Sequence, residues 1–375
     1  MLISAQRVLL EDAPELAEGW VEVAEEQILD IGRGEPPRAP DLVVDGVLVP
    51  GYVDAHCHGG GGASFVTEDP EVVRVATAAH RRLGTTSIVA SLVTGAYSDL
   101  HRQVACLAGL VEAGELAGIH LEGPWLAERY KGAHPPQLLT DPEPAAVAAL
   151  LATGRGTVKM ATIAPERAGA MESIGLMVDA GCLAAVGHTA ATYEIAVAAI
   201  DAGARGATHL FNAMPPLLHR LPGPVLALWQ DERVIVELVM DGVHVRPELV
   251  AWVMGTAPGR VAMVTDAMAA AAAGDGDYIL GELAVEVRDG VARLAGQDTI
   301  AGSTLTLDKA VRNAVAAGVG LVPALRAAST VPADYLGLDS VGRLAPGKRA
   351  DLLVLDDALK VTKVMWRGAW QEWVA

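Results

Sequence analysis

The stretch YVDAHCH at residues 52–58 is the first of eight short apolar segments that decide the fold. The other seven are TSIVASL (86–92), AGIHLEG (117–123), VKMATIAP (158–165), LAAVGH (183–188), GATHLFN (206–212), VIVELVMDGVHV (234–245) and VAMVTDAM (261–268). Alanine-rich stretches of helical period separate them, such as PEVVRVATAAHRRLG (70–84) and TYEIAVAAIDAG (192–203). Eight strands alternating with helices over roughly 220 residues predict an α/β protein with a TIM-like (β/α)8 barrel. A doubly wound open sheet fits the same strand count.

The two ends of the chain have a different pattern. The N-terminal stretches LISAQRVLL, WVEVAEEQILDIG and LVVDGVLVP and the C-terminal stretches ADLLVLD and VTKVMWRGAW read as strands and turns. We therefore predict a small β-sandwich domain built from residues 1–50 and 345–375, and a barrel domain over residues 51–344. Residues 277–294 predict a β-hairpin that turns at Arg288-Asp289-Gly290 and is inserted after the eighth barrel strand.

Composition narrows the class of function. The chain has 375 residues and a formal net charge of −18, which argues against general binding to nucleic acid or to an anionic membrane. Its three cysteines are too few for a disulfide scaffold and fit a reducing cytoplasm. Neither a signal peptide nor an apolar run long enough to span a membrane is recognisable in the sequence.

Residues able to bind a metal or a proton lie at the ends of the predicted strands. They are His56, His58, Glu122, His188, His209, His244 and Asp266. In a barrel the carboxyl ends of the strands meet at one face, where active sites of this fold are built. These side chains are therefore expected to lie together.

Imidazoles beside a carboxylate form a ligand set for a divalent metal. His56 and His58 lie on one side of a strand because side chains alternate along it. With Glu122, His188 and His209 they suit zinc, although iron or another first-row ion is also compatible. Asp266 is the candidate for proton transfer, since a carboxylate near such an ion can accept a proton from water.

Longer motifs make a family resemblance specific. The stretches PGYVDAHCHGGGG, HLEGPWLAERYKGAHPPQ, VGHTAATYE, ATHLFNAMPPLLHRLPGP, DGVHV, VTDAM and IAGSTLTLDKAV occur in that order. Together they resemble the N-acetylglucosamine-6-phosphate deacetylases of the amidohydrolase superfamily. The resemblance covers nearly the whole chain, including the closing GRLAPGKRADLLVLD.

The resemblance implies a role for individual residues. Glu122, His188 and His209 match the principal metal ligands of the family, and Asp266 matches its catalytic aspartate. The positions that match substrate-contacting residues are Ala133, His134, Asn212, Ala213, Arg220, His244, Ile300, Ala301 and Gly302. Of these, Asn212, Ala213, Arg220 and His244 match positions that hold the sugar phosphate. The family also implies a homodimer in which the neighbouring subunit supplies part of the phosphate site.

The number of metal ions stays open at this stage. Some family members lack the histidine pair and use one ion, whereas others keep it and bind two ions bridged by the glutamate. This chain has both His56 and His58, so a second ion is chemically possible. Lys159 lies near the start of its strand, which argues against a carboxylated bridging lysine.

The expected reaction is hydrolysis of N-acetyl-D-glucosamine 6-phosphate to D-glucosamine 6-phosphate and acetate, in amino-sugar catabolism or recycling. Two alternatives remain: another amidohydrolase reaction, such as cyclic-amide hydrolysis or deamination, and a catalytically silent assembly protein. Two further residues are expected to have no catalytic role. Cys57 alternates away from the histidines as a wall residue, and His80 lies on the surface of a helix.

Overall fold

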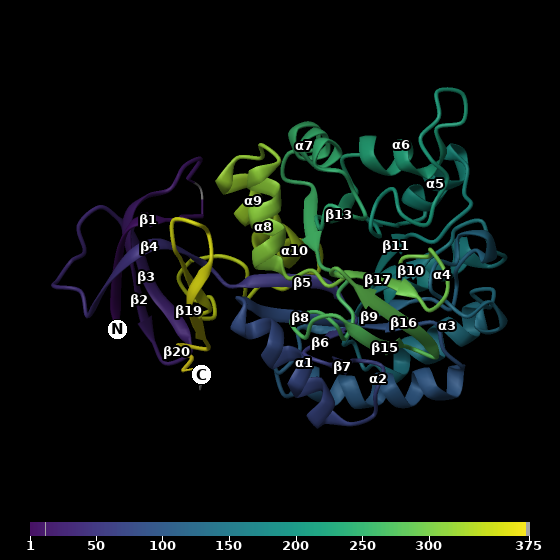
Figure 1. Cartoon of the computed structure of the whole chain (residues 1–375), viewed down its shortest axis with the longest axis horizontal. Coiled ribbons are helices and arrows are strands. Elements are labelled where there is room, and N and C mark those ends of the chain that lie inside the picture. The colour runs from purple at the N-terminus through teal and green to yellow at the C-terminus, as the bar shows by residue number, and fades with distance from the viewer. Residues whose placement is uncertain (12, 373–375) are drawn as a thin grey trace.

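The computed structural model describes residues 1–11 and 13–372 and has a barrel at its centre (Figure 1). Eight parallel strands are hydrogen-bonded in chain order, so the predicted barrel is confirmed. The strands are β5 (Tyr52–Cys57), β8 (Thr85–Val93), β9 (Gly118–Glu122), β10 (Val158–Ile163), β11 (Leu183–Val186), β12 (Gly206–Ala207), β13 (Ile235–Val239) and β14 (Val261–Val264).

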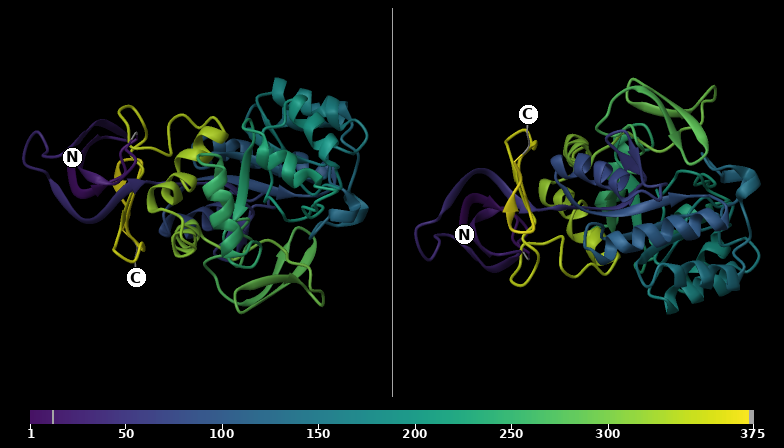
Figure 2. Two further views of the ribbon diagram at one scale, coloured as in Figure 1. Left: turned by 90° about the horizontal axis from the view of Figure 1, so that it is seen from above. Right: turned by 90° about the horizontal axis from the view of Figure 1, so that it is seen from below.

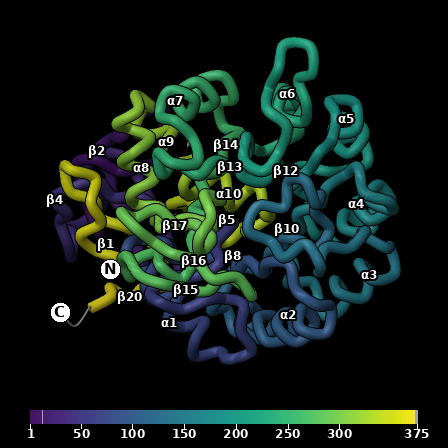
Figure 3. The backbone as a smooth tube through the Cα atoms, turned by 45° about the vertical axis from the view of Figure 1, so that its right-hand side comes forward, coloured from purple at the N-terminus to yellow at the C-terminus, as the bar shows by residue number. Residues whose placement is uncertain are grey.

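Helices follow the barrel strands and cover their outer side (Figure 3). They are α1 (Pro70–Arg82), α2 (Tyr97–Glu112), α3 (Pro144–Thr153), α4 (Ala170–Asp179), α5 (Tyr193–Asp201), α6 (Gly223–Gln230), α7 (Pro247–Thr256), α8 (Leu307–Ala316), α9 (Leu321–Ala327) and α10 (Thr330–Tyr335). Among the described residues, no helix combines the length and apolar character that crossing a membrane requires.

Local sequence explains where these elements begin. Asp69 caps α1 by accepting a hydrogen bond from the backbone N–H of Glu71 at 2.9 Å, and Pro70 occupies the first helical turn. All nine residues of β8 are buried, as expected for a strand with the barrel interior on one face and helices on the other.

The barrel closes between its first and last strands just beyond the end of β14. The backbone N–H of Asp266 donates to the carbonyl of His56 at 2.9 Å, and that of His58 donates to the carbonyl of Ala267 at 2.7 Å. A single parallel bridge pairs Cys57 with Ala267. Barrel closure therefore places the histidine pair directly beside Asp266.

Both chain ends join one small sheet. Its order is β20-β19-β18-β4-β1-β2-β3, so the β-sandwich expected from the sequence takes the form of one seven-stranded sheet. The bounds are β1 (Leu2–Val8), β2 (Ala17–Ala24), β3 (Gln27–Arg33), β4 (Leu42–Pro50), β18 (Leu352–Leu355), β19 (Val361–Trp366) and β20 (Ala369–Trp370). The sheet curls, because Ile28 on β3 exchanges backbone hydrogen bonds with the segment that leads into β18.

Alternation along β4 and β18 divides this sheet into two faces. Leu48 and Leu352 point into the core of the small sheet, whereas Val49 and Leu353 join the core of the barrel. The sheet is thereby held against the barrel, and both termini lie on that side of the molecule (Figure 1). We propose the predicted domain boundaries, residues 1–50 with 345–375 and residues 51–344, for these two units; residues 373–375 lie outside the described residues.

The predicted hairpin after the eighth strand is present with one additional strand. β16 (Leu283–Arg288) and β17 (Val291–Leu294) pair across Asp289-Gly290, and β15 (Gly276–Leu280) pairs with β16 on its other side. Figure 2 shows this three-stranded sheet lying against one side of the barrel. Val285 and Leu294 pack in one apolar cluster with Met268 and Ala133, so the insert is anchored close to the predicted site.

Candidate metal centre

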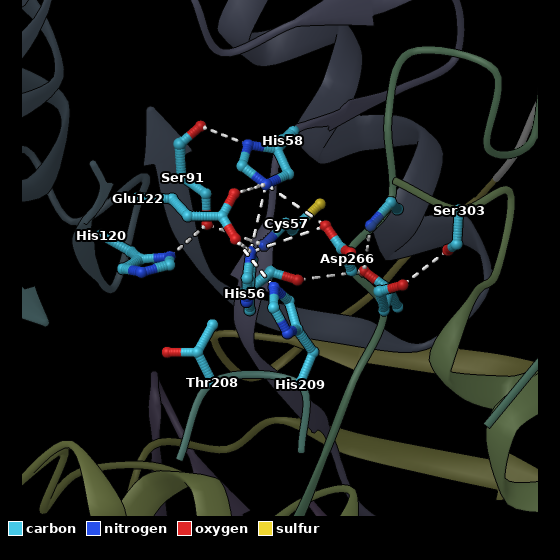
Figure 4. Close-up of polar contacts among 12 residues, drawn as sticks. His56, Cys57, His58, Ser91, His120, Glu122, Thr208, His209, Asp266 and Ser303 are labelled. Carbon is cyan, nitrogen blue, oxygen red and sulfur yellow. Dashed lines mark hydrogen bonds and ion pairs between the residues drawn. The ribbon is translucent and has the colours of Figure 1, made fainter. Parts of the chain in front are cut away.

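The strand ends bring the predicted ligands together. His56 and Glu122 lie within β5 and β9, while His188, His209 and Asp266 each follow the last strand residue by two positions. These residues and His58 are all at most 7 % exposed. Figure 4 shows the Glu122 carboxylate pointing toward His56 and His58, with Asp266 across from it.

Glu122 is the centre of the cluster. Its Oε1 lies 3.1 Å from Nε2 of both His188 and His209, and its Oε2 lies 3.0 Å from Nε2 of His58. Oε1 is also 3.5 Å from Nε2 of His56. One carboxylate therefore lies between two pairs of imidazoles, with Oε1 facing His188, His209 and His56 and Oε2 facing His58.

The spacing of the imidazole nitrogens fits metal ions. Nε2 of His56 and Nε2 of His58 are 3.1 Å apart, and those of His188 and His209 are 3.0 Å apart. Two nitrogens bound to one tetrahedral zinc at about 2.0–2.1 Å would lie roughly 3.3 Å apart. The chemistry and the spacing of these donors suit a divalent ion at each pair.

The other ring nitrogen shows which histidines can act as ligands. Nδ1 of His58 lies 3.2 Å from the carbonyl of Ser91, and Nδ1 of His188 lies 2.8 Å from the carbonyl of Tyr130. A carbonyl only accepts, so each Nδ1 carries a hydrogen, and each Nε2 is the nitrogen that can give a lone pair to a metal when the ring is neutral.

His134 has the opposite arrangement. Its Nδ1 accepts a hydrogen bond from the backbone N–H of Thr94 at 3.3 Å, so in the neutral ring the hydrogen is on Nε2. That Nε2 lies 3.5 Å from Oε2 of Glu122. His134 is therefore arranged as a hydrogen-bond donor beside the metal ligands.

The charge balance of the cluster favours ionised carboxylates. Burial alone would raise the pKa of Asp266, but the positive charge of His56 and a hydrogen bond from His58 outweigh it and hold this pKa below its usual value. Burial likewise opposes ionisation of Glu122, yet the histidines hold its pKa well below the usual range. Both carboxylates can thus be negative in the metal-free protein.

Strained backbone is concentrated at the same place. His188, His209, Ala213 and Asp266 have φ angles of +46°, +29°, +52° and +48°. Non-glycine residues rarely adopt this region unless the surrounding structure imposes it, and such residues gather at functional sites. The turn after β12 also explains why this strand ends at Ala207, earlier than the apolar segment 206–212 suggests.

A cavity of about 380 Å³ opens onto the cluster. Its lining includes seven of the predicted substrate-contacting residues: Ala133, His134, Asn212, Ala213, His244, Ile300 and Gly302. Ala301 is fully buried and does not line the cavity. The geometry therefore brings most of the predicted substrate contacts to the metal ligands.

His244 is held in place by its neighbour Asp241, whose Oδ2 lies 2.7 Å from Nδ1 of the ring. Burial lowers the pKa of His244, but the Asp241 carboxylate outweighs this effect and raises it above the usual value. Nε2 of His244 lies 4.0 Å from Oδ2 of Asp266, on the cavity side. His244 thus offers a positively charged group to an anion in the cavity.

Arg220 lies apart from the cavity of its own chain. It is exposed and forms no ion pair with another described residue. Its loop precedes α6 and projects from the molecule (Figure 3). Arg220 is therefore not among the residues that line the cavity of its own chain.

The cavity is also lined by residues to which the sequence analysis assigned no role. Arg129 and Tyr130 from the short helix η1 (Glu128–Tyr130) line it, together with Asp298 and Thr299 of the loop before Ile300. Arg129 and Tyr130 lie within the quoted stretch HLEGPWLAERYKGAHPPQ, but the resemblance assigned no role to either of them. No signal in the sequence pointed to Asp298 or Thr299.

One buried cluster lies behind the histidine pair. His80, expected on the surface, is instead fully buried, and its Nε2 donates to the carbonyl of Gly59 at 2.8 Å. The α1 face that carries it packs against the barrel, which the helix pattern alone did not locate. Cys57 is buried beside His80, as expected for a wall residue.

Known proteins similar to this chain in sequence and structure are deacetylases of 6-phosphorylated N-acetylhexosamines. N-acetyl-D-glucosamine-6-phosphate deacetylase from Mycobacterium smegmatis, solved with N-acetyl-D-glucosamine 6-phosphate, is similar with a TM-score of 0.96 and 49% identity over 99% of this chain and 98% of that one. N-acetylgalactosamine-6-phosphate deacetylase of Escherichia coli O157:H7 is 37% identical over 98% of both chains. N-acetylglucosamine-6-phosphate deacetylase of Bos taurus is 36% identical over 87% of this chain and 84% of its own length.

The family comparison covers all eight barrel strands and, in the small sheet, the end of β4 together with β18, β19 and β20. The sequence pattern of the amidohydrolase family matches residues 47–370. This match includes every strand that carries a ligand of the metal centre. The chain therefore belongs to the amidohydrolase family.

Proposed function

We propose that the protein hydrolyses the acetamido group of N-acetyl-D-glucosamine 6-phosphate, releasing acetate and D-glucosamine 6-phosphate. The observation that carries this proposal is the Glu122 carboxylate between two histidine pairs, with Asp266 and His134 beside it, at the base of a cavity. The similar proteins act on 6-phosphorylated N-acetylhexosamines.

Glu122, His188 and His209 would hold one divalent ion, and His56 and His58 a second. Zinc suits these nitrogen and oxygen donors, and iron is the alternative. A bound ion would polarise the amide carbonyl and lower the pKa of water from 15.7 to about 7, which supplies hydroxide at neutral pH.

Asp266 carries the proton through the reaction. Its ionised carboxylate accepts a proton from the attacking water as the C–O bond to the acetyl carbon forms. It then returns that proton to the sugar nitrogen as the C–N bond breaks, so acetate and the free amine leave. His134 donates from Nε2 to the acetyl oxygen as negative charge develops there.

The phosphate would be held by contributions from two subunits. His244 and the backbone near Asn212 and Ala213 lie in the cavity of the same chain. Arg220, exposed on its projecting loop, would reach the cavity of a partner in a homodimer, where its planar fork can pair with two phosphate oxygens. The loop at Ile300–Gly302 would form the opposite wall.

N-acetyl-D-galactosamine 6-phosphate is a second candidate substrate. The relative from Escherichia coli O157:H7 that acts on it is similar over nearly the full length of both chains. The two sugars differ only in the configuration of one hydroxyl group. Amino-sugar metabolism in a reducing cytoplasm fits either substrate and the three free cysteines.

An acetate-release assay tests the proposal. Wild-type protein is expected to release acetate from one or both 6-phosphorylated sugars, and from the unphosphorylated sugars far more slowly. Asp266→Asn should lower kcat by about 10²–10⁴-fold, the usual contribution of a general acid–base group. Release of ammonia instead of acetate would favour a deaminase, and wild-type turnover by Asp266→Asn would remove the proposed proton carrier.

A further inference from the structure

Glu237 is a carboxylate in the middle of an apolar barrel strand. It is the third residue of β13, between Val236 and Leu238, and it is fully buried. A buried carboxylate is costly unless its oxygens are hydrogen-bonded or paired with a charge. The sequence motifs did not single it out, although a single acidic residue in VIVELVM is itself a signal.

The contacts of Glu237 lead to the metal centre. Its Oε2 lies 3.2 Å from Nδ1 of His56 and accepts a bond from the backbone N–H of His209 at 3.4 Å. Its Oε1 accepts from the Tyr335 hydroxyl at 3.4 Å. Among the described residues no lysine or arginine pairs with it, so His56 is its only ionic partner.

This contact decides what the other side of the His56 ring can do. An acceptor at Nδ1 keeps a hydrogen there, so Nε2, which faces His58 and Glu122, is the nitrogen that can give a lone pair to a bound ion. Carboxylate partners of metal-binding histidines fix the ring orientation and raise its basicity.

The other histidines of the cluster have different supports. Nδ1 of His58 and of His188 faces a neutral backbone carbonyl. Nδ1 of His209 has no hydrogen-bond partner among the described residues. Among the described residues, His56 is therefore the one candidate metal ligand whose Nδ1 faces a buried carboxylate.

We propose that Glu237 is a positioning residue that prepares His56 to bind the ion held by the His56–His58 pair. The proposal rests on the metal-dependent function above and deepens it, because it assigns the affinity of one particular ion to a residue outside the ligand set. The ion held by Glu122, His188 and His209 depends much less on Glu237.

Metal binding without substrate tests this role. The metal-free protein is titrated with Zn²⁺ at fixed pH by equilibrium dialysis, and the bound metal is measured by elemental analysis. Glu237→Met keeps the length of the side chain and removes the acceptor. This variant should lower the affinity for one of the two bound ions by about 10–100-fold, the usual loss when such a hydrogen-bonding partner of a ligand is removed. Glu237→Gln keeps a neutral carbonyl acceptor. Its affinity for that ion should therefore lie between those of the wild type and Glu237→Met.

Two further variants separate positioning from folding. His56→Ala should weaken the same ion that Glu237→Met weakens. Asp351→Asn alters a carboxylate that is 3 % exposed and bonded to Arg349 and Arg367 in the small sheet, so it should lower thermal stability and leave both affinities unchanged.

Three results would overturn the proposal. The first is two ions bound to Glu237→Met with wild-type affinity. The second is an equal loss of affinity for both ions, in proportion to the loss of thermal stability. The third is a wild-type protein with one bound ion that is insensitive to Glu237→Met. Because no substrate is present, these outcomes are independent of whether the protein deacetylates a sugar phosphate.

Discussion

Replacing Arg220 by alanine separates folding, substrate recognition and subunit assembly. Arg220 is exposed and makes no ion pair with another described residue, so its loss should change the free energy of unfolding by no more than about 0.5 kcal/mol. The same loop exposes Leu217, Leu218 and Leu221 by 44%, 50% and 74%. A contact with a second subunit would cover them.

The kinetic effect follows from the proposed contact with phosphate. A hydrogen bond to a charged group contributes about 1.5–3 kcal/mol. At about 1.36 kcal/mol per factor of ten, its loss lowers kcat/KM for the phosphorylated sugar by roughly 10–150-fold. Turnover of unphosphorylated N-acetylglucosamine should be unchanged. Arg155→Ala is the matched control, since Arg155 is also exposed but pairs with Glu112 at the opposite end of the barrel.

Mixed dimers reveal which subunit Arg220 serves. Asp266→Asn chains should be nearly inactive and Arg220→Ala chains should show the lowered kcat/KM, but a dimer of one with the other contains one site with both native residues. Random mixing of equal amounts of a symmetric dimer makes half of the dimers mixed, which restores about a quarter of the wild-type sites. Acetate release is measured after unfolding and refolding the two chains together. No recovery on mixing, or an equal kinetic loss on both substrates, would refute the assignment of Arg220 to the partner's phosphate site.

Two other predictions concern single side chains. His134→Asn should lower kcat for acetate release by about 10²-fold with little change in KM, because it removes a donor to the developing negative charge; a change confined to KM would contradict this role. The thiols should react in order of their burial and pKa: burial raises the pKa of Cys182 to about 12 and that of Cys57 well above its usual value, while Cys106 is partly exposed. At pH 8 the buried thiols hold almost no thiolate, so iodoacetamide should label Cys106 first in the native protein, as peptide mass spectrometry will show; rapid labelling of Cys182 would contradict the buried environment.

The barrel could be predicted because its strands are buried on both sides and therefore read as uninterrupted apolar segments. β8, with all nine residues buried, is an example. The ends of β12 and β13 were harder to predict, because the chain continues with apolar residues after each strand has ended. At His209 and Ala213 the backbone has a positive φ angle, which the periodicity of apolar side chains does not reveal.

The ligand residues could be predicted because each lies at or just beyond the carboxyl end of a strand, in a fold whose strand ends meet at one face. The supports of those ligands could not be predicted, since they are formed by contacts between strands far apart in the sequence. Glu237 reaches His56 across 181 residues, and the carbonyl of Tyr130 reaches His188 across 58. Burial of His80 and exposure of Arg220 likewise depend on tertiary packing, which motif spacing does not contain.

Deacetylation of a sugar phosphate should require the ions that the Glu122 cluster would hold. The most direct test is acetate release from N-acetyl-D-glucosamine 6-phosphate before chelation, after chelation and after return of Zn²⁺ in measured amounts. The chelated protein should stay folded by circular dichroism, release no acetate, and regain its rate as one or two ions per chain are bound. Full activity of the metal-free protein, or no activity in the fully reconstituted protein, would contradict the claim.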